Sequence, residues 1–252
     1  MEPSVVTSLG RIVGRGLIGV EEYLGIPYAV PPTGKRRFAP SRPWTTPFKT
    51  GLLDASGFGA PCHQSTGYWD TEPFEHPQSP PAIPPPSEDC LNLNIWRPAR
   101  HTAHPRSLLP VMVWVHGGGM CGGSGSLKPF NGSQLTSRDA NVLVVTLNYR
   151  LGPLGFLASH ELLSTTGATG GLNGVHDQIV ALKWIQAHVR SFGGDPERVT
   201  LWGESSGGVS VCLVNVSPLA KGAHCRDHHR PKPCLGPAPT ALAPHRCSHR
   251  AV

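Results

Sequence analysis

The sequence has 252 residues, a hydrophobic fraction of 38%, a charged fraction of 15% and a formal net charge of +6. This length supports one sizeable hydrophobic core or two small ones, and the low charged fraction excludes a coiled coil or a highly charged disordered protein. The positive charge is uneven, because residues 223–252 contain five basic residues and one acidic residue. The basic character therefore belongs to a tail and does not predict a nucleic-acid-binding face.

The first third of the chain is expected to be antiparallel and then irregular. Residues 4–28 contain short apolar runs separated by glycine turns, a pattern typical of antiparallel strands. Residues 30–89 are rich in proline, with the stretches PPTGKRRFAP and PQSPPAIPPPSED, and favour surface loops. A loop region of this length is usually functional or is held down by other interactions.

From Leu91 onward the pattern is that of an α/β core. Strands are indicated by LNLNIW, PVMVWVHG and NVLVVTLNY, of which the last two are suited to burial on both faces. Residues 174–191 carry apolar side chains at three- and four-residue spacing and predict an amphipathic helix. A further buried strand follows in FGGDPERVTLWG. This order predicts an α/β fold with a mostly parallel central sheet and a small antiparallel start.

The composition and the apolar periodicity of the sequence change after Lys221. Residues 223–252 show no apolar periodicity and are rich in His, Arg, Pro and Cys, which predicts a disordered tail. Three cysteines there, Cys225, Cys234 and Cys247, are capable zinc ligands, but they lack the paired short spacing of structural zinc sites. The sequence therefore predicts a folded unit over residues 1–222, a divergent tail over 223–252 and no metal site.

The stretch GESSG, residues 203–207, matches the pattern G-x-S-x-G. In this pattern a strand turns sharply into a helix with the serine at the tip, and small neighbours let adjacent backbone pass. The required context is present, because VTLW precedes the pentapeptide and GGVSVCLV follows it. The alternative is a simple Gly/Ser turn, which this context disfavours. The pattern predicts Ser205 as a nucleophile.

A glycine loop follows the strand at residues 111–115 and contains His116 and Gly117–Gly119. A serine that attacks an acyl carbon creates an oxyanion, which preorganised backbone N–H groups must stabilise. One donor follows the nucleophile, at Ser206, and others come from such a loop. The alternative is a phosphate-binding loop, but the lysine of that motif is missing. His116 is expected to support the loop, because the pattern takes its base from late in the chain.

Several segments resemble the type-B carboxylesterase family, which includes the cholinesterases and has the α/β-hydrolase fold. They occur in the family's order: YLGIPYAVPPTGKRRFAP, SEDCLNLNIWRP, PVMVWVHGGG, VVTLNYRLGPLGFL and GLNGVHDQIVALKWIQAHVRSFGGDPERVTLWGESSGG. The resemblance covers roughly residues 4–222. It implies that residues 1–222 are the N-terminal part of an α/β-hydrolase domain, truncated after the nucleophile.

The resemblance assigns roles residue by residue. It implies that Ser205 is the nucleophile and that the oxyanion hole consists of the N–H groups of Gly118, Gly119 and Ser206. The family usually has alanine where this chain has Ser206, and serine suits the role because only its N–H is needed. Supporting roles fall to His116, Gly117 and Glu204.

Structural features are also implied by the resemblance. Cys62 and Cys90 match the family's first disulfide, with two free thiols as the alternative, since no signal peptide opens the chain. The family's internal ion pairs are matched by Arg37 with Glu88 and by Arg150 with Asp177. The alternative is that these four side chains are unpaired charges solvated at the protein surface.

The acid and the histidine of the hydrolase triad are not recognisable. The triad runs Ser, Asp or Glu, and then His in chain order, but only 47 residues follow Ser205. The histidines of the tail are His224, His228, His229, His245 and His249. They lack a family-like context, and a disordered histidine cannot hold a reactive geometry. We therefore expect a truncated or mis-spliced product, or a gene model with a shifted frame after about Gly222.

The expected function is hydrolysis of small-molecule carboxylic esters through an acyl-serine intermediate, with no metal and no organic cofactor. The alternatives are a non-catalytic cholinesterase-like interaction protein, a truncated non-functional product, and a nucleic-acid-binding module built on the basic tail. No apolar run reaches the ~18 residues that span a bilayer, and no secretory signal opens the chain, although the resembled family is mostly secretory. The compartment and the oligomeric state stay open.

Overall fold

The computed structural model describes residues 2–64, 83–99, 108–137, 141–166 and 171–223. The expected disorder of the tail, its histidines and the cysteines that were weighed as zinc ligands lie outside these residues. Ala223, the first residue of the predicted tail, is buried in the hydrophobic core, and its N–H donates to the carbonyl oxygen of Ala220.

A small sheet stands at the start of the chain. Strands β1 (Ser4–Thr7) and β2 (Gly10–Val13) form an antiparallel hairpin, and β5 (Leu52–Asp54) pairs with β2 in parallel. The predicted antiparallel start is therefore confirmed.

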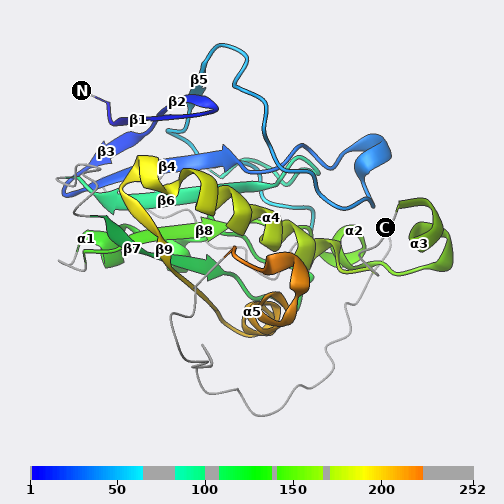
Figure 1. Ribbon diagram of the computed structural model, residues 1–252. Helices are drawn as coiled ribbons and strands as arrows, with labels where there is room; N and C mark the ends of the chain where they lie inside the picture. The colour runs from blue at the N-terminus through cyan, green and yellow to red at the C-terminus, as the bar shows by residue number, and fades with distance from the viewer. Residues whose placement is uncertain (1, 65–82, 100–107, 138–140, 167–170, 224–252) are drawn as a thin grey trace.

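The central sheet has six strands among the residues that the structure describes (Figure 1). In spatial order they are β3 (Arg15–Leu17), β4 (Val20–Pro27), β6 (Asn92–Pro98), β8 (Leu143–Leu147), β7 (Leu109–Val115) and β9 (Gly194–Gly203). Strand β7 pairs in parallel with both β8 and β9, whereas the pairings β3–β4, β4–β6 and β6–β8 are antiparallel.

The sheet is therefore mixed, and its antiparallel part extends beyond the N-terminal start to include β6. The physical reason lies in the connections. Strand β6 pairs with β8 and not with β7, and only residues 99–108 separate β6 from β7. So short a connection suits two strands that run in opposite directions, since parallel strands need a crossover of a dozen or more residues. The parallel part is confined to β8, β7 and β9, whose carboxyl ends lie at one edge of the sheet.

Five α-helices occur in the described ranges: α1 (Ser133–Ser137), α2 (Gly152–Phe156), α3 (His160–Thr166), α4 (Asn173–His188) and α5 (Ser206–Val216). The predicted long helix is α4, which continues as a 3-10 turn over Val189–Phe192 and stops at Gly193, a residue with φ of 86°. Glycine adopts this left-handed conformation readily and so ends the helix. None of the helices in the described ranges is both long and apolar enough to cross a membrane.

The two faces of the central sheet are covered differently. Val111, Val113 and Val115 of β7 belong to the main core, together with apolar side chains of α4 and α5, and Figure 1 shows these two helices beside the sheet. The alternate residue Trp114 points to the other face, where its ring lies 4.4 Å from that of Trp202. Because side chains alternate along a strand, one face forms the main core and the other carries the tryptophans.

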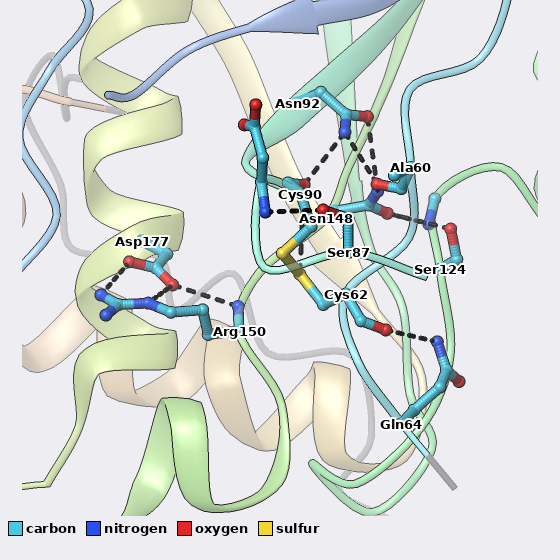
Figure 2. Close-up of a disulfide and its surroundings, with 12 residues drawn as sticks. Ala60, Cys62, Gln64, Ser87, Cys90, Asn92, Ser124, Asn148, Arg150 and Asp177 are labelled. Carbon is cyan, nitrogen blue, oxygen red and sulfur yellow. Dashed lines mark hydrogen bonds and ion pairs between the residues drawn. A yellow bond between two sulfur atoms is a disulfide. The ribbon is translucent and has the colours of Figure 1, made fainter. Parts of the chain in front are cut away.

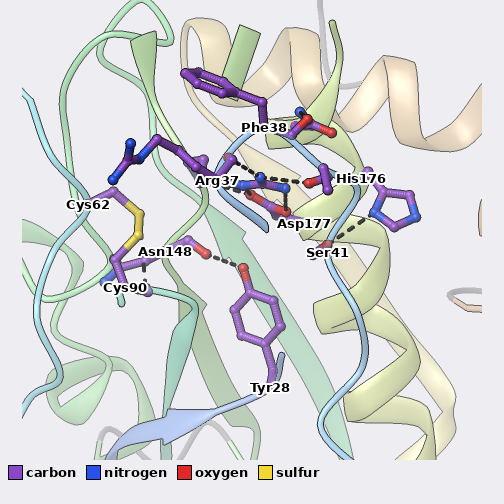
Figure 3. Close-up of polar contacts among 12 residues, drawn as sticks. Tyr28, Arg37, Phe38, Ser41, Cys62, Cys90, Asn148, His176 and Asp177 are labelled. Carbon is purple, nitrogen blue, oxygen red and sulfur yellow. Dashed lines mark hydrogen bonds and ion pairs between the residues drawn. A yellow bond between two sulfur atoms is a disulfide. The ribbon is translucent and has the colours of Figure 1, made fainter. Parts of the chain in front are cut away.

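A buried ion pair connects the end of β8 to α4. Nε and Nη2 of Arg150 lie 2.8 and 2.7 Å from the carboxylate oxygens of Asp177, and both side chains are at most 2% exposed. The remaining Nη1 of Arg150 donates to the carbonyl oxygens of Arg37 and Ala39. Figure 3 shows this cluster beside Tyr28, whose hydroxyl donates to the carbonyl oxygen of Asn148. The first part of the proline-rich segment is thus held against the core.

We predict that Asp177→Ala lowers the free energy of unfolding by about 3–5 kcal/mol, because the guanidinium of Arg150 then stays buried without its counter-charge. Chemical denaturation of the purified variant measures the change. The matched control is Asp195→Ala, which breaks a pair with Arg198 whose side chain is 53% exposed, and a loss below about 1 kcal/mol is expected there. Equal losses in the two variants would contradict the prediction.

Candidate active site

Ser205 lies in a sharp turn between β9 and α5. Its backbone has φ of 54° and ψ of −125°, and β9 ends at Gly203 while α5 begins at Ser206. A residue with a side chain rarely adopts a positive φ, so the surrounding structure must impose this conformation. Ser205 is exposed at the tip of the turn.

Two glycines make this turn possible. A Cβ atom at Gly207 would overlap the carbonyl oxygen of Val115, and one at Gly203 would come within 2.7 Å of the same oxygen. Helix α5 therefore begins in direct contact with the carboxyl end of β7. Only residues without a side chain allow so close an approach, which explains the glycines on both sides of Ser205.

The glycine loop begins at the same edge of the sheet, because Val115 of β7 pairs with Gly203 of β9. Gly118 and Gly119 have φ of 104° and 63°, and the carbonyl oxygen of Gly118 accepts from the N–H groups of Cys121 and Gly122. Their own N–H groups donate to no residue in the described part of the chain. They are available to bind an external acceptor.

The glycine loop and the serine turn are in direct contact. A Cβ atom at Gly117 would come within 2.8 Å of the carboxylate of Glu204 and within 3.2 Å of Cβ of Ser205. The carbonyl oxygen of Glu204 accepts from the N–H of Gly207 and so closes the turn. The structure therefore brings Gly117–Gly119, Glu204, Ser205 and Ser206 together in space.

The hydroxyl of Ser206 makes a contact that sequence reasoning did not anticipate. Its Oγ accepts from the N–H of Met120 at 3.2 Å, and Met120 has φ of 62°. From the sequence, only the N–H of Ser206 was expected to take part in the site. The signal that could have revealed the contact is the replacement of the family's usual alanine by a side chain able to hydrogen-bond.

His116 is buried behind the glycine loop. Its Nδ1 lies 2.8 Å from the carbonyl oxygen of Gly117, and its ring stacks on that of Tyr149 at 4.4 Å. The hydroxyl of Tyr149 donates to the carbonyl oxygen of His116. Burial lowers the pKa of His116 to about 4, against a smaller raising effect of the hydrogen bond to Gly117. His116 is therefore a neutral ring in contact with the backbone of the glycine loop.

Burial also acts on Tyr149, whose pKa it raises well above the usual range, against a smaller lowering effect of a hydrogen bond with the side chain of Ser206. Tyr149 stays protonated as a result, so its hydroxyl remains a donor to His116. Tyr149 and Ser206 thus join the end of β8 to the start of α5.

The described residues supply no base to Ser205. Its Oγ has no hydrogen bond to an imidazole or a carboxylate in these ranges, and Glu204 is exposed beside it. The same ranges contain no cluster of three or more His, Cys, Asp or Glu residues able to hold a metal ion. What the described part of the chain offers at Ser205 is a presented hydroxyl and a set of backbone donors.

The expected disulfide between Cys62 and Cys90 is present and lies beside a network of buried amides (Figure 2). Nδ2 of Asn92 donates to the carbonyl oxygens of Ala60 and Cys90, and Nδ2 of Asn148 also donates to that of Ala60. The disulfide segment is therefore fixed to the ends of β6 and β8.

The two ion pairs of the sequence analysis have different environments. Arg37 and Glu88 lie 2.8 Å apart near the disulfide, with side chains 45% and 24% exposed, whereas Arg150 and Asp177 are buried. A partly exposed pair contributes little to stability and a buried one is costly to break.

Buried polar residues of β6 and β8 also anchor the glycine loop, and the sequence analysis missed them. The N–H of Gly125 donates to Oδ1 of Asn148 at 2.8 Å, and its carbonyl oxygen accepts from Oγ1 of Thr146 at 2.7 Å. Asn94 contacts Thr146. The signal was available in LNLNIW, where asparagines alternate with apolar residues in a strand that is buried throughout, since a buried amide must find partners.

Comparison with known proteins identifies the family. The sequence model of the carboxylesterase family matches residues 1–227. The chain is 42% identical over 221 residues to the para-nitrobenzyl esterase of Bacillus subtilis, covering 86% of this chain and 41% of that protein. It is 44% identical over 207 residues to the cocaine esterase of Oryctolagus cuniculus, covering 81% of this chain and 36% of that protein.

Solved structures agree with the sequence matches. A thermophilic PNB esterase superposes with a TM-score of 0.77 at 38% identity, over 89% of this chain and 43% of that one. A carboxylesterase of Geobacillus stearothermophilus gives a TM-score of 0.74 at 36% identity, over 88% of this chain and 42% of that one. The described sheet, helices and serine turn are thus an N-terminal part of the α/β-hydrolase fold.

This chain spans about two fifths of the length of the relatives that it matches. Within that span the identity exceeds a third of the positions and the family model covers most of the chain. The chain belongs to the carboxylesterase family.

Proposed function

We propose that this chain carries the nucleophile and the oxyanion hole of a carboxylic ester hydrolase. The observation that supports the proposal most strongly is the backbone of Ser205, which has a strained positive φ at the tip of a strand–helix turn. Strained residues of this kind are held in place by the surrounding structure and cluster at functional sites. In a strand–helix turn, the strained conformation presents the serine hydroxyl. In the glycine loop beside the turn, the N–H groups of Gly118 and Gly119 donate to no residue among those that the structure describes.

The reaction would proceed by acyl transfer. Oγ of Ser205 attacks the acyl carbon, the serine proton passes to a base, and the bond from that carbon to the alcohol oxygen breaks as the alcohol takes up a proton. Water then attacks the acyl-serine and releases the carboxylic acid. A serine hydroxyl is a weak nucleophile without a base. In this fold the base comes late in the chain order, outside the described residues.

Stabilisation of the oxyanion would come from backbone dipoles. The proposed donors are the N–H groups of Gly118, Gly119 and Ser206, and each such donor typically lowers the activation barrier by roughly 3–4 kcal/mol. Ser206 begins an α-helix of 11 residues, and the positive end of a helix dipole favours negative charge at that point. Neutral His116 adds no charge and keeps the loop in shape.

The substrates we propose are small-molecule carboxylic esters. The names of two relatives, a para-nitrobenzyl esterase and a cocaine esterase, refer to such molecules. We extend to this chain only the class of substrate.

The proposal predicts that a fluorophosphonate probe labels Ser205. Mass spectrometry of the digested protein should find the adduct on the peptide that contains Ser205. Ser205→Ala should abolish both this adduct and any hydrolysis of a p-nitrophenyl ester, with a fall in rate of roughly 10³-fold or more, because no other group replaces the nucleophile.

The matched control is Ser164→Ala, which removes an exposed serine hydroxyl that donates to the carbonyl oxygen of Glu161 on α3. This variant should be labelled like the parent chain. An adduct that persists in Ser205→Ala, or a parent chain that is not labelled at Ser205, would overturn the proposal.

The buried state of His116 predicts a pH dependence of stability. Because its pKa is lowered to about 4 in the folded protein, the unfolded state binds the proton more readily. Stability is therefore complete above pH 6.5 and is lost as the pH falls toward 4, by up to about 3 kcal/mol. Denaturation midpoints measured from pH 7 to pH 4 should fall less steeply in His116→Asn, whose amide can still donate to Gly117.

The control for this series is His160→Asn, the same substitution at an exposed position. A pH profile changed equally by both substitutions would show that His116 is not the source of the dependence.

A further inference from the structure

Gln64 links the disulfide segment to the glycine loop. Its Oε1 accepts from the N–H of Gly123 at 2.7 Å, and its Nε2 donates to the carbonyl oxygen of the same glycine at 3.0 Å. Nε2 also donates to the carbonyl oxygen of Cys62 at 3.2 Å (Figure 2). One side-chain amide thus satisfies both backbone groups of Gly123, with bond lengths typical of good hydrogen bonds.

Gly123 lies directly behind the start of the glycine loop. A Cβ atom there would overlap the ring of His116 at Nδ1 and would come within 2.6 Å of the carbonyl oxygen of Gly117. Gly123 has φ of 106°, so it occupies this place in a conformation that suits glycine alone. A shift of Gly123 would therefore displace His116 and Gly117, and with them the N–H groups of the next two residues.

The neighbours of Gly123 are anchored elsewhere. Gly125 is bonded to Asn148 and Thr146, and the hydroxyl of Ser124 donates to Oδ1 of Asn148. These anchors belong to β8 and to the residue after it. Gln64 alone connects the loop to the segment that the Cys62–Cys90 bond holds in place, among the contacts of the described residues.

We propose that Gln64 is a positioning residue for the oxyanion hole, acting through Gly123, and that the Cys62–Cys90 disulfide keeps it in register. This inference rests on the proposed function for its catalytic meaning. A purely structural glutamine would contribute to global stability. A positioning glutamine controls the local mobility of residues 116–123.

Amide hydrogen exchange of the full chain separates these two roles without any need for activity. In Gln64→Ala, peptides that cover residues 120–123 should exchange about tenfold faster than in the parent chain. The N–H of Gly123 loses its acceptor, and the bonded N–H groups of Met120, Cys121 and Gly122 loosen with it. Exchange in the strands of the central sheet should not change. Unchanged exchange at residues 116–123, or acceleration spread evenly over the protein, would overturn the proposal.

The matched control is Gln186→Ala. Nε2 of Gln186 donates to the carbonyl oxygen of Pro196, which lies near the start of β9, whereas Ser205 follows the end of that strand. This variant loses the same side chain and one hydrogen bond, and exchange at residues 116–123 should match that of the parent. Equal acceleration in the control would show that the effect is not specific to Gln64.

Conservative variants provide a second test if Gln64→Ala does not fold. In Gln64→Glu the carboxylate still accepts from the N–H of Gly123 but cannot donate to its carbonyl oxygen, so we expect protection between that of the parent and that of the alanine variant. Gln64→Asn shortens the side chain and should lose both bonds. Exchange in Gln64→Glu as fast as in Gln64→Asn would contradict the two-point contact.

The role of the disulfide is tested by combining Gln64→Ala with the double variant Cys62→Ala/Cys90→Ala. A reductant is unsuitable, because Cys121, a residue of the same loop, is also disulfide-bonded. If the disulfide acts through Gln64, the combined variant should exchange at residues 116–123 no faster than the faster of Gln64→Ala and Cys62→Ala/Cys90→Ala. The reason is that the effects of coupled sites are not additive. Additive acceleration would exclude this coupling.

Labelling of Ser205 by the fluorophosphonate provides the catalytic readout. Gln64→Ala should lower the maximal labelling rate about tenfold and leave the probe concentration at half-maximal rate unchanged, because a misplaced oxyanion hole acts on the transition state. If the parent chain is not labelled, the proposed function fails and the exchange data still decide the contact of Gln64. If exchange changes while labelling of a reactive parent does not, the positioning role is overturned.

Discussion

The buried pair of Arg150 and Asp177 is the interaction on which the rest of this structure depends. It joins the chain just after β8 to α4, and the spare nitrogen of Arg150 holds the carbonyl oxygens of the segment at Arg37–Ala39. Two charges removed from water are tolerable only when every donor is satisfied, and here the guanidinium has partners on two segments, at Arg37–Ala39 and at Asp177, that are far apart in sequence. The pair therefore fixes the position of a helix and of a loop relative to the sheet at once.

From this pair, a continuous set of contacts leads to the serine turn. The N–H of Gly152, two residues after Arg150, donates to the carbonyl oxygen of Met120, and the N–H of Met120 donates to the hydroxyl of Ser206. A second set starts at the disulfide and reaches the same loop through Gln64 and Gly123. Gly117–Gly119 have no side chains that could pack. The shape of the glycine loop is therefore imposed from both sides by neighbouring segments.

The site follows from the direction of three strands. Because β8, β7 and β9 are parallel, their carboxyl ends meet at one edge, where the glycine loop leaves β7 and the serine turn leaves β9. Ligands of open α/β sheets bind at this edge. The close approach of Gly207 to Val115 then sets the distance between the two. Backbone N–H groups that donate to no described residue lie there beside a presented hydroxyl, an arrangement that suits the proposed oxyanion hole.

The sequence by itself determined the strands of the core, the long helix α4, the strand–turn–helix around Ser205 and the glycine loop after β7, because these depend on local periodicity and on glycines required by backbone geometry. It also carried the family, through segments in a fixed order. Tertiary structure alone decided the mixed character of the sheet, since strand direction depends on connections and pairing partners. It likewise decided the contact of Gln64 with Gly123, the bond of Ser206 to Met120 and the burial that keeps His116 neutral. These features join residues far apart in the chain, and no local pattern records which distant backbone group a buried amide, hydroxyl or imidazole will meet.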